Sequence, residues 1–194
     1  MTKRAETTSG TDEGMSGATV RARAIIVRAA LEILPLNPTA SLNEIAERAG
    51  VGRSTLHRHF ADRDDVVLSL ARYISEAAIQ AIQRASPEFG EPQDALRRIV
   101  NELFDLGPAL VWMHENVRRE QTQVFYSEFN AGINALETLF ERARPTGSDL
   151  PVIWRNRVFW EVLRLGASFT EELPRQRVID MIIATLSNGV VESN

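Results

Sequence analysis

The sequence of 194 residues contains no cysteine, and its 22 lysine and arginine residues include a single lysine, Lys3. Without cysteine the chain cannot form disulfides, thiolate metal sites or a cysteine nucleophile. No segment approaches the roughly 18 consecutive apolar residues of a membrane span, and the residues after Met1 are polar, unlike those of a secretory signal. These absences predict a soluble cytoplasmic protein that makes no membrane contact.

Acidic residues outnumber basic ones over the whole chain, whose formal net charge is −4 at pH 7. An acidic protein as a whole repels nucleic acid, so DNA binding requires a local excess of basic residues. Residues 53–63 contain three arginines and one acid, Asp62. The acidic excess lies elsewhere, which is compatible with DNA binding if only one end of the molecule meets DNA.

Motifs of catalysis are missing as well. His114-Glu115 begins like a zinc-protease motif, but Arg118 stands where the second histidine ligand would be. His57 and His59 lie about 160° apart on a helix and cannot share a metal ion. No phosphate-binding glycine loop, nucleophile elbow or paired carboxylates occur. The sequence therefore predicts no enzyme, no cofactor and no metal site.

Helical periodicity is what the sequence has in abundance. Residues 1–17 have almost nothing to bury, which predicts a disordered tail. Beyond them, apolar residues recur at helical spacing, first up to a break at Pro35 and later over a long fourth helix, about 66–84. Proline and glycine separate the later helices, and no strand pattern competes. An all-α fold follows, with a first domain over 18–65 and a second over 66–194.

The most informative segment is residues 41–60. Ser41 and Glu44 match a capping box, which marks the start of a helix. Gly50-Val51-Gly52 then interrupts the helical pattern before a second short helix. A glycine-rich turn lets two short helices cross steeply, so that the second lies in a DNA major groove while the first braces it. This segment predicts a helix-turn-helix.

Its details resemble the DNA-binding end of the TetR family of transcriptional regulators. There the turn is followed by Thr-Leu-Tyr-x-His-Phe, and a basic residue opens the next helix; here the sequence reads Thr55-Leu56-His57-Arg58-His59-Phe60, followed by Arg63. The resemblance covers about residues 21–73. It implies an N-terminal three-helix DNA-binding domain, joined through the fourth helix to a C-terminal helical domain that binds a small effector and dimerises. Gly52 and His57 stand where the family commonly has serine and tyrosine.

The short helix over 53–60 separates two faces. Leu56 and Phe60 point toward the core, whereas Ser54 and Arg58 point outward. An outward arginine suits bidentate binding to guanine, and a hydroxyl can reach a base edge or a phosphate. The resemblance implies phosphate roles for the two histidines and for the arginine that opens the fourth helix, with packing as the alternative for the histidines. The expected DNA contacts are Arg53, Ser54, Thr55, His57, Arg58, His59 and Arg63.

The C-terminal part concentrates large aromatic and flexible side chains. They can line a cavity for a small apolar or amphipathic effector, or they can simply fill a core. The candidate pocket residues are Phe104, Trp112, Met113, His114, Phe125, Tyr126, Phe129, Trp154 and Phe159.

One recognition helix reads only a few base pairs, so the sequence predicts a homodimer on a palindromic operator. The family resemblance implies that the last two helices form the interface as part of a four-helix bundle; an intramolecular core is the alternative. The candidate interface residues are Leu163, Gly166, Ala167, Thr170, Ile179, Ile183 and Leu186.

The predicted function is that of a DNA-binding transcriptional regulator. The first interpretation is a repressor that leaves its double-stranded operator when an effector binds the C-terminal cavity. The alternatives are a DNA-organising or interaction protein without small-molecule control, and an activator.

Overall fold

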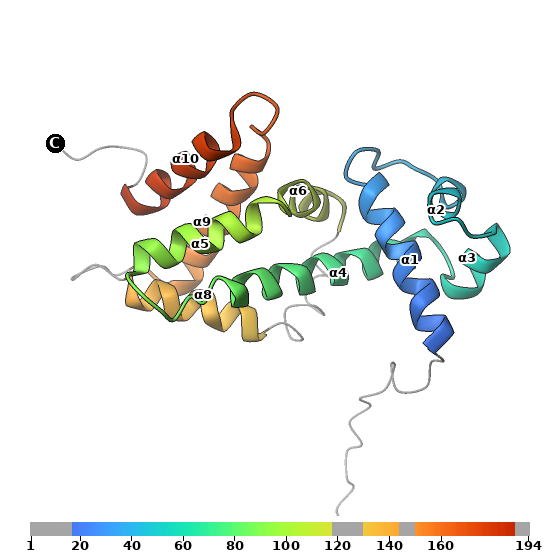
Figure 1. Cartoon of the computed structure of the whole chain (residues 1–194), viewed down its shortest axis with the longest axis horizontal. Coiled ribbons are helices and arrows are strands. Elements are labelled where there is room, and N and C mark those ends of the chain that lie inside the picture. The colour runs from blue at the N-terminus through green and yellow to red at the C-terminus, as the bar shows by residue number, and fades with distance from the viewer. Residues whose placement is uncertain (1–16, 118–129, 144–149, 189–194) are drawn as a thin grey trace, which may run out of the picture.

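A computed structural model describes residues 17–117, 130–143 and 150–188, and all regular structure within them is helical (Figure 1). The predicted all-α fold is therefore confirmed. Of the predicted tail over 1–17, residues 1–16 lie outside the described residues, as do the candidate pocket residues Phe125, Tyr126 and Phe129, whereas Gly17 already belongs to the first helix. None of the described helices combines the length and hydropathy that a membrane span requires.

Three short helices form one end of the molecule: α1 (Gly17–Ile33), α2 (Leu42–Arg48) and α3 (Arg53–His59). The predicted capping box starts α2. The backbone N–H of Ser41 donates to the Glu44 carboxylate at 2.7 Å, and the Ser41 hydroxyl accepts from the backbone N–H of Glu44 at 3.3 Å. The hydrogen bonds from the Ser41 backbone and hydroxyl hold the pKa of Glu44 below its usual value. Local sequence thus sets the start of α2.

The turn between α2 and α3 needs a glycine at its first position. Gly50 has φ +65°, a left-handed conformation that a side chain disfavours. Gly52 then caps α3 in an extended conformation without a side-chain hydrogen bond. This turn sets the angle at which α3 leaves α2.

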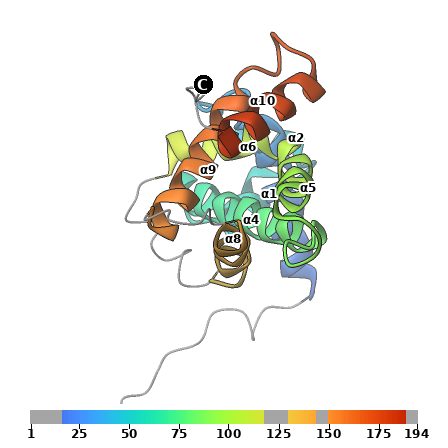
Figure 2. The ribbon, with the colours of Figure 1, turned by 90° about the vertical axis from the view of Figure 1, so that its left-hand side faces the viewer.

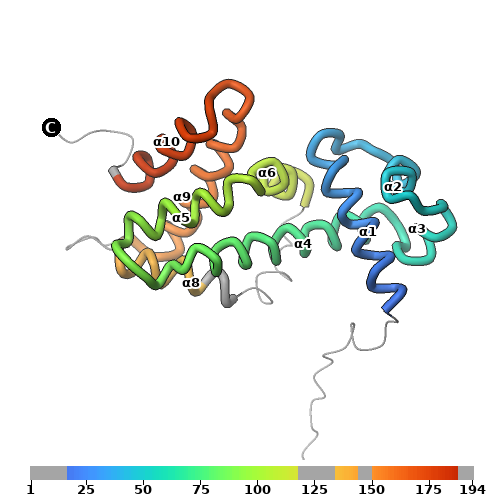
Figure 3. The backbone as a smooth tube through the Cα atoms, viewed as in Figure 1, coloured from blue at the N-terminus to red at the C-terminus, as the bar shows by residue number. Residues whose placement is uncertain are grey.

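The fourth helix, α4 (Arg63–Arg84), is about 33 Å long, at 1.5 Å per residue. It runs from the three short helices into the C-terminal helices, as the tube in Figure 3 shows. Its buried residues include Val66 and Leu70 near α1 and Ala81 and Ile82 at the far end. Because α4 begins at Arg63, the predicted domain boundary between 65 and 66 falls inside a helix that belongs to both parts.

The described residues of the C-terminal part form five further helices, of which three pack on α4 and the last two pack on those three (Figure 2). One of these helices ends at Phe104, and the next begins at Gly107 and Pro108. Proline fits the first turn of a helix, where its missing N–H has no partner to lose. The five helices are α5 (Pro92–Phe104), α6 (Gly107–Asn116), α8 (Asn130–Arg142), α9 (Val152–Ala167) and α10 (Arg175–Asn188).

Two arginines hold the loop that follows α4. Arg98 of α5 donates to the carbonyl oxygens of Ala85, Ser86 and Phe89 at 2.8, 3.0 and 2.8 Å. Arg142 of α8 donates to the carbonyls of the same loop, at residues 87 and 90. The C-terminal end of α4 is thereby tied to both α5 and α8.

Two glycines allow the helices around α9 to approach closely. A Cβ at Gly107 would lie 2.6 Å from the Cβ of Ala167, so α6 rests directly on α9. A Cβ at Gly166 would lie 2.7 Å from Cγ1 of Ile182, so α10 rests on the other side of the same turn. These contacts make the end of α9 part of the core.

For the candidate interface residues, this packing favours the alternative of an intramolecular core. The small residues of α9 are covered by α6 and α10 of the same chain. Thr170 remains exposed, and Leu186 packs half-buried against the core. The candidate interface residues that are buried within the chain are Leu163, Gly166, Ala167, Ile179 and Ile183.

Replacing Gly107 by alanine should lower the free energy of unfolding by about 1–3 kcal/mol, because the added methyl group meets a short side chain that cannot rotate away. Urea denaturation of the full chain measures the loss. Gly17→Ala is the matched control, since its Cβ would meet only the end of the Arg21 side chain at 3.5 Å. Equal stabilities of the two variants would contradict the close packing of α6 on α9.

Candidate nucleic-acid interface

The two faces of α3 are those expected from the sequence. Leu56 and Phe60 are 1% and 0% exposed, and Val51 packs against the same core. On the opposite side Ser54 and Arg58 are exposed. The short helix is therefore anchored by its apolar face and presents its polar face to solvent.

Four of the seven expected DNA contacts extend freely from this end of the molecule. Arg53, Ser54, His57 and Arg58 are exposed, and Thr55 is half-buried beside them. Within the described part of the chain these four side chains make no hydrogen bond or ion pair. They can reach a base edge or a phosphate without breaking an internal contact first.

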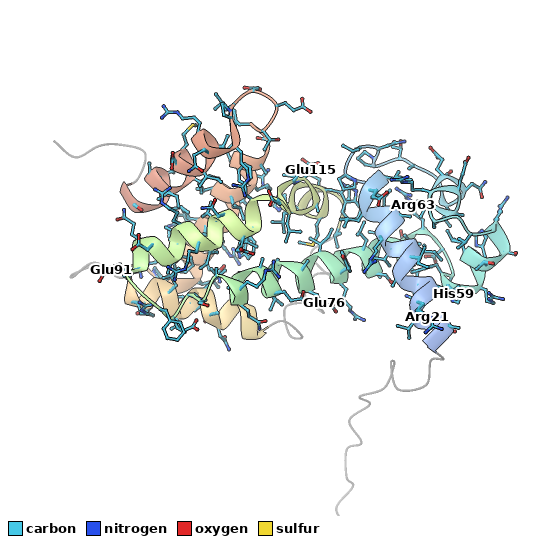
Figure 4. The ribbon with its side chains drawn as sticks, in the orientation of Figure 1. Arg21, His59, Arg63, Glu76, Glu91 and Glu115 are labelled. Carbon is cyan, nitrogen blue, oxygen red and sulfur yellow. The ribbon has the colours of Figure 1, made fainter. Side chains whose placement is uncertain are left out.

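Arg63 is placed differently. Its guanidinium donates to the backbone carbonyls of Pro38 and Ala40, in the connector between α1 and α2. Figure 4 shows it beside α1, away from His59. The side chain closes the connector onto the start of α4, and a phosphate contact would compete with these two carbonyls.

His59 lies at the C-terminal end of α3, next to the first half of α1 (Figure 4). The residue is half-buried, and its Nε2 is buried with no hydrogen-bond partner among the residues described. That nitrogen faces the protein, so the arrangement favours the packing alternative over a phosphate contact through Nε2.

Arg23 of α1 is a site residue that the sequence analysis missed. Its guanidinium donates to the backbone carbonyl of His59 and, at 2.9 Å, to the hydroxyl of Ser69. It also lies 3.4 Å from the Asp65 carboxylate and stacks 4.2 Å from the ring centroid of Phe60. No local pattern signals this role, because the partners lie 36 to 46 residues away in sequence.

Two carboxylates at the start of α4 accept hydrogen bonds from backbone N–H groups. Asp62 accepts from the backbone N–H of Asp65 at 2.9 Å, and Asp65 accepts from the backbone N–H of Ala61 at 3.2 Å. Carboxylates also complement the positive end of the α4 dipole. Their negative charge is thus used to shape the α3–α4 turn, while the arginines of α3 point outward.

The six candidate pocket residues that the structure describes differ in burial. Phe104, Trp112 and Phe159 are buried, and Met113 is half-buried with its sulfur 3.7 Å from the Ser75 hydroxyl. His114 is exposed at the end of α6 and Trp154 is 57% exposed on α9, so both side chains lie at the surface of the described part of the chain.

Trp154 lies in a surface hollow of about 350 Å³. Its indole stands near the N-terminal end of α9, where the helix begins after Pro151. The hollow is lined by Leu150, Pro151, Ile153, Trp154 and Arg157.

A steep pair of short helices with an outward basic face, joined by a long helix to a separate helical part, defines a helix-turn-helix transcriptional regulator. Residues 26–70 match the family model of bacterial regulatory proteins of the tetR family. The chain is 35% identical over 177 residues to the HTH-type transcriptional repressor LfrR of Mycolicibacterium smegmatis, covering 91% of this chain and 94% of LfrR. The chain belongs to the TetR family and is a DNA-binding transcriptional regulator.

Solved structures of LfrR share the fold. The crystal structure of LfrR in complex with proflavine matches 91% of this chain and all of the LfrR chain, with a TM-score of 0.81 and 34% identity. A second LfrR crystal structure matches 87% of this chain and 99% of the other, with a TM-score of 0.66 and 32% identity. The helix-turn-helix and the C-terminal helical part are thus arranged as in a known repressor.

Proposed function

We propose that the protein is a homodimeric repressor that occupies a palindromic operator and is released by a small apolar or amphipathic effector. The observation that carries the DNA-reading part is α3, with Leu56 and Phe60 in the core and Arg53, Ser54 and Arg58 exposed on the opposite side. The repressor role is supported by the 35% identity to LfrR over most of both chains.

The DNA contacts that we propose fall into two kinds. Ser54, Thr55 and Arg58 contact base edges in the major groove, because they project from the middle of the exposed face. Arg53 and His57 flank them and bind phosphates on either side of the groove. Arg63 stabilises the domain through the α1–α2 connector and reaches phosphate only if it exchanges a carbonyl partner.

We place the dimer interface on the outward faces of α9 and α10, next to the candidate interface residues. Leu165 is 56% exposed and Met181 is 41% exposed, each one position from a residue of the α9–α10 contact, Gly166 and Ile182. α10 also forms the edge of the molecule opposite α8 in both views (Figures 1 and 2). Two copies meeting through these faces would bury the exposed apolar side chains.

Effector control is proposed for the interior of the C-terminal part. The indole N–H of Trp112 is buried and has no acceptor among the residues that the structure describes, a state that costs free energy unless another molecule supplies the acceptor. That the similar repressor LfrR was crystallised in complex with proflavine also supports a small-molecule effector. The effector acts by favouring a spacing of the two α3 helices that no longer fits successive grooves, through α4.

The proposal is tested by selecting bound sequences from a random duplex library with the full-length protein. The expected product is a two-fold symmetric site whose half-sites lie one helical turn (~34 Å) or a multiple of it apart. Enrichment of no sequence would favour the DNA-organising alternative. The affinity for the selected duplex should fall steeply with salt in both cases, so the salt dependence alone does not decide.

Effector control is tested with proflavine as the probe. Calorimetry of the protein without DNA should show binding, and proflavine should release the protein from the selected duplex. Because proflavine intercalates into DNA, Trp112→Phe is compared at the same proflavine concentration, where intercalation contributes equally. Release of both proteins to the same extent, together with no calorimetric binding, would contradict effector control by this class of ligand.

A further inference from the structure

A single arginine of α1 joins the recognition helix to the helix that follows it. His59 is the last residue of α3, and Phe60 caps that helix in an extended conformation. Asp65 and Ser69 lie one turn apart on α4. All four groups contact the guanidinium of Arg23, which itself is 29% exposed on its side chain.

We propose that Arg23 is a positioning residue for sequence reading, which fixes the tilt of α3 relative to α1 and α4. This inference rests on the proposed function, in which α3 reads bases. Its two terminal nitrogens are directed at His59, Asp65 and Ser69, and its flat face lies on Phe60, so it is engaged inside the domain and is not available to a phosphate.

A change in the tilt of α3 should affect binding to the operator and binding to unrelated DNA to different extents. Base contacts need side chains held within about 0.5 Å of their productive geometry, whereas phosphate contacts tolerate small shifts because they depend mainly on charge. A change in the tilt of α3 therefore weakens binding to the operator more than binding to unrelated DNA. Arg23 lies outside residues 26–70, where the family model matches.

The matched test exchanges arginine for lysine at two positions of α1. Arg23→Lys keeps the charge, but an ammonium cannot bond three partners in a fork and lie flat on an aromatic ring at once. Arg28→Lys is the control, because Arg28 lies about 140° around α1 from Arg23 and makes no hydrogen bond or ion pair with the described residues. Affinities of the full chain are measured by fluorescence anisotropy for the selected duplex and a shuffled duplex of equal length, at several KCl concentrations.

For Arg23→Lys we expect the ratio of the two affinities to fall about tenfold, with the shuffled duplex bound within twofold of the parent and the salt slope unchanged. This ratio cancels any loss of folded protein, since unfolding lowers both affinities alike. Ser69→Ala, which removes one partner and leaves the charge, should lower the ratio by about two- to threefold. Arg28→Lys should leave it unchanged.

Two results would overturn the inference. One is an unchanged ratio for both Arg23→Lys and Ser69→Ala while the parent remains selective. The other is an equal loss of affinity on both duplexes for an Arg23→Lys protein that remains folded, which would show that Arg23 contributes to general DNA affinity and not to base reading. A parent protein that does not discriminate between the duplexes would instead contradict the proposed function, so the two failures are distinguishable.

Discussion

Replacing Arg58 by alanine should weaken binding to the selected operator about ten- to a hundredfold and relax the preference at one base pair of each half-site. The guanidinium projects from the middle of the exposed face of α3, where a bidentate contact to a base is worth about 1–3 kcal/mol of discrimination. Selection with the variant, followed by anisotropy measurements on single-base substitutions of the operator, gives both quantities.

Two control variants distinguish the loss of a base contact from the loss of charge or of stability. Arg157→Ala removes an exposed arginine of α9 and should change neither affinity nor preference. Arg63→Ala should weaken all sequences alike, because it loosens the connector at Pro38 and Ala40 rather than a base contact. An identical base preference for Arg58→Ala and the parent would show that Arg58 does not read a base.

Replacing Leu165 by aspartate should convert the proposed dimer into a monomer and lower the affinity for the palindromic operator by about 10² to 10⁴, since the two reading helices then bind independently. An aspartate on the outward face of α9 would lose its hydration in the proposed dimer with no partner to compensate. Sedimentation velocity gives the association state, and anisotropy gives the affinity.

The matched control for Leu165→Asp is Phe89→Asp in the loop after α4. Phe89 is 66% exposed, comparable to 56% for Leu165, but it lies in the loop held by Arg98 of α5 and Arg142 of α8, outside α9 and α10. This variant should remain dimeric and bind the operator normally. A dimeric Leu165→Asp protein with parental affinity would rule out the outward faces of α9 and α10 as the interface.

The helix-turn-helix could be predicted from the sequence because its determinants are local. Ser41 and Glu44 cap α2 three residues apart, Gly50 supplies the left-handed turn, and Leu56 and Phe60 share a face four residues apart. Each of these interactions joins residues within one or two helical turns, so a short stretch of sequence is enough to predict it.

The C-terminal part could not be predicted to the same depth. Helical periodicity shows which residues of α9 are apolar on one face, but not whether that face meets its own chain or a second copy. Gly166 and Ala167 have the small side chains of a close helix contact, and the structure shows that α10 and α6 of the same chain make that contact. Leu165, one position away, is the residue left exposed.

The roles of the arginines also depend on the tertiary fold. Arg63 is in register with the family motif, yet its guanidinium bonds to carbonyls 23 and 25 residues earlier. Arg23 has no motif around it and gains its partners only when α1 packs on α3 and α4. Such contacts join residues distant in sequence, so spacing alone carries no signal for them.

A crystal structure of the protein bound to its selected duplex tests the central claim most directly. We expect α3 to lie in the major groove, with the Arg58 guanidinium within hydrogen-bond distance of a base edge and with Leu56 and Phe60 still in the core. A complex in which α3 lies outside the groove, or in which Arg58 contacts no base, would contradict it.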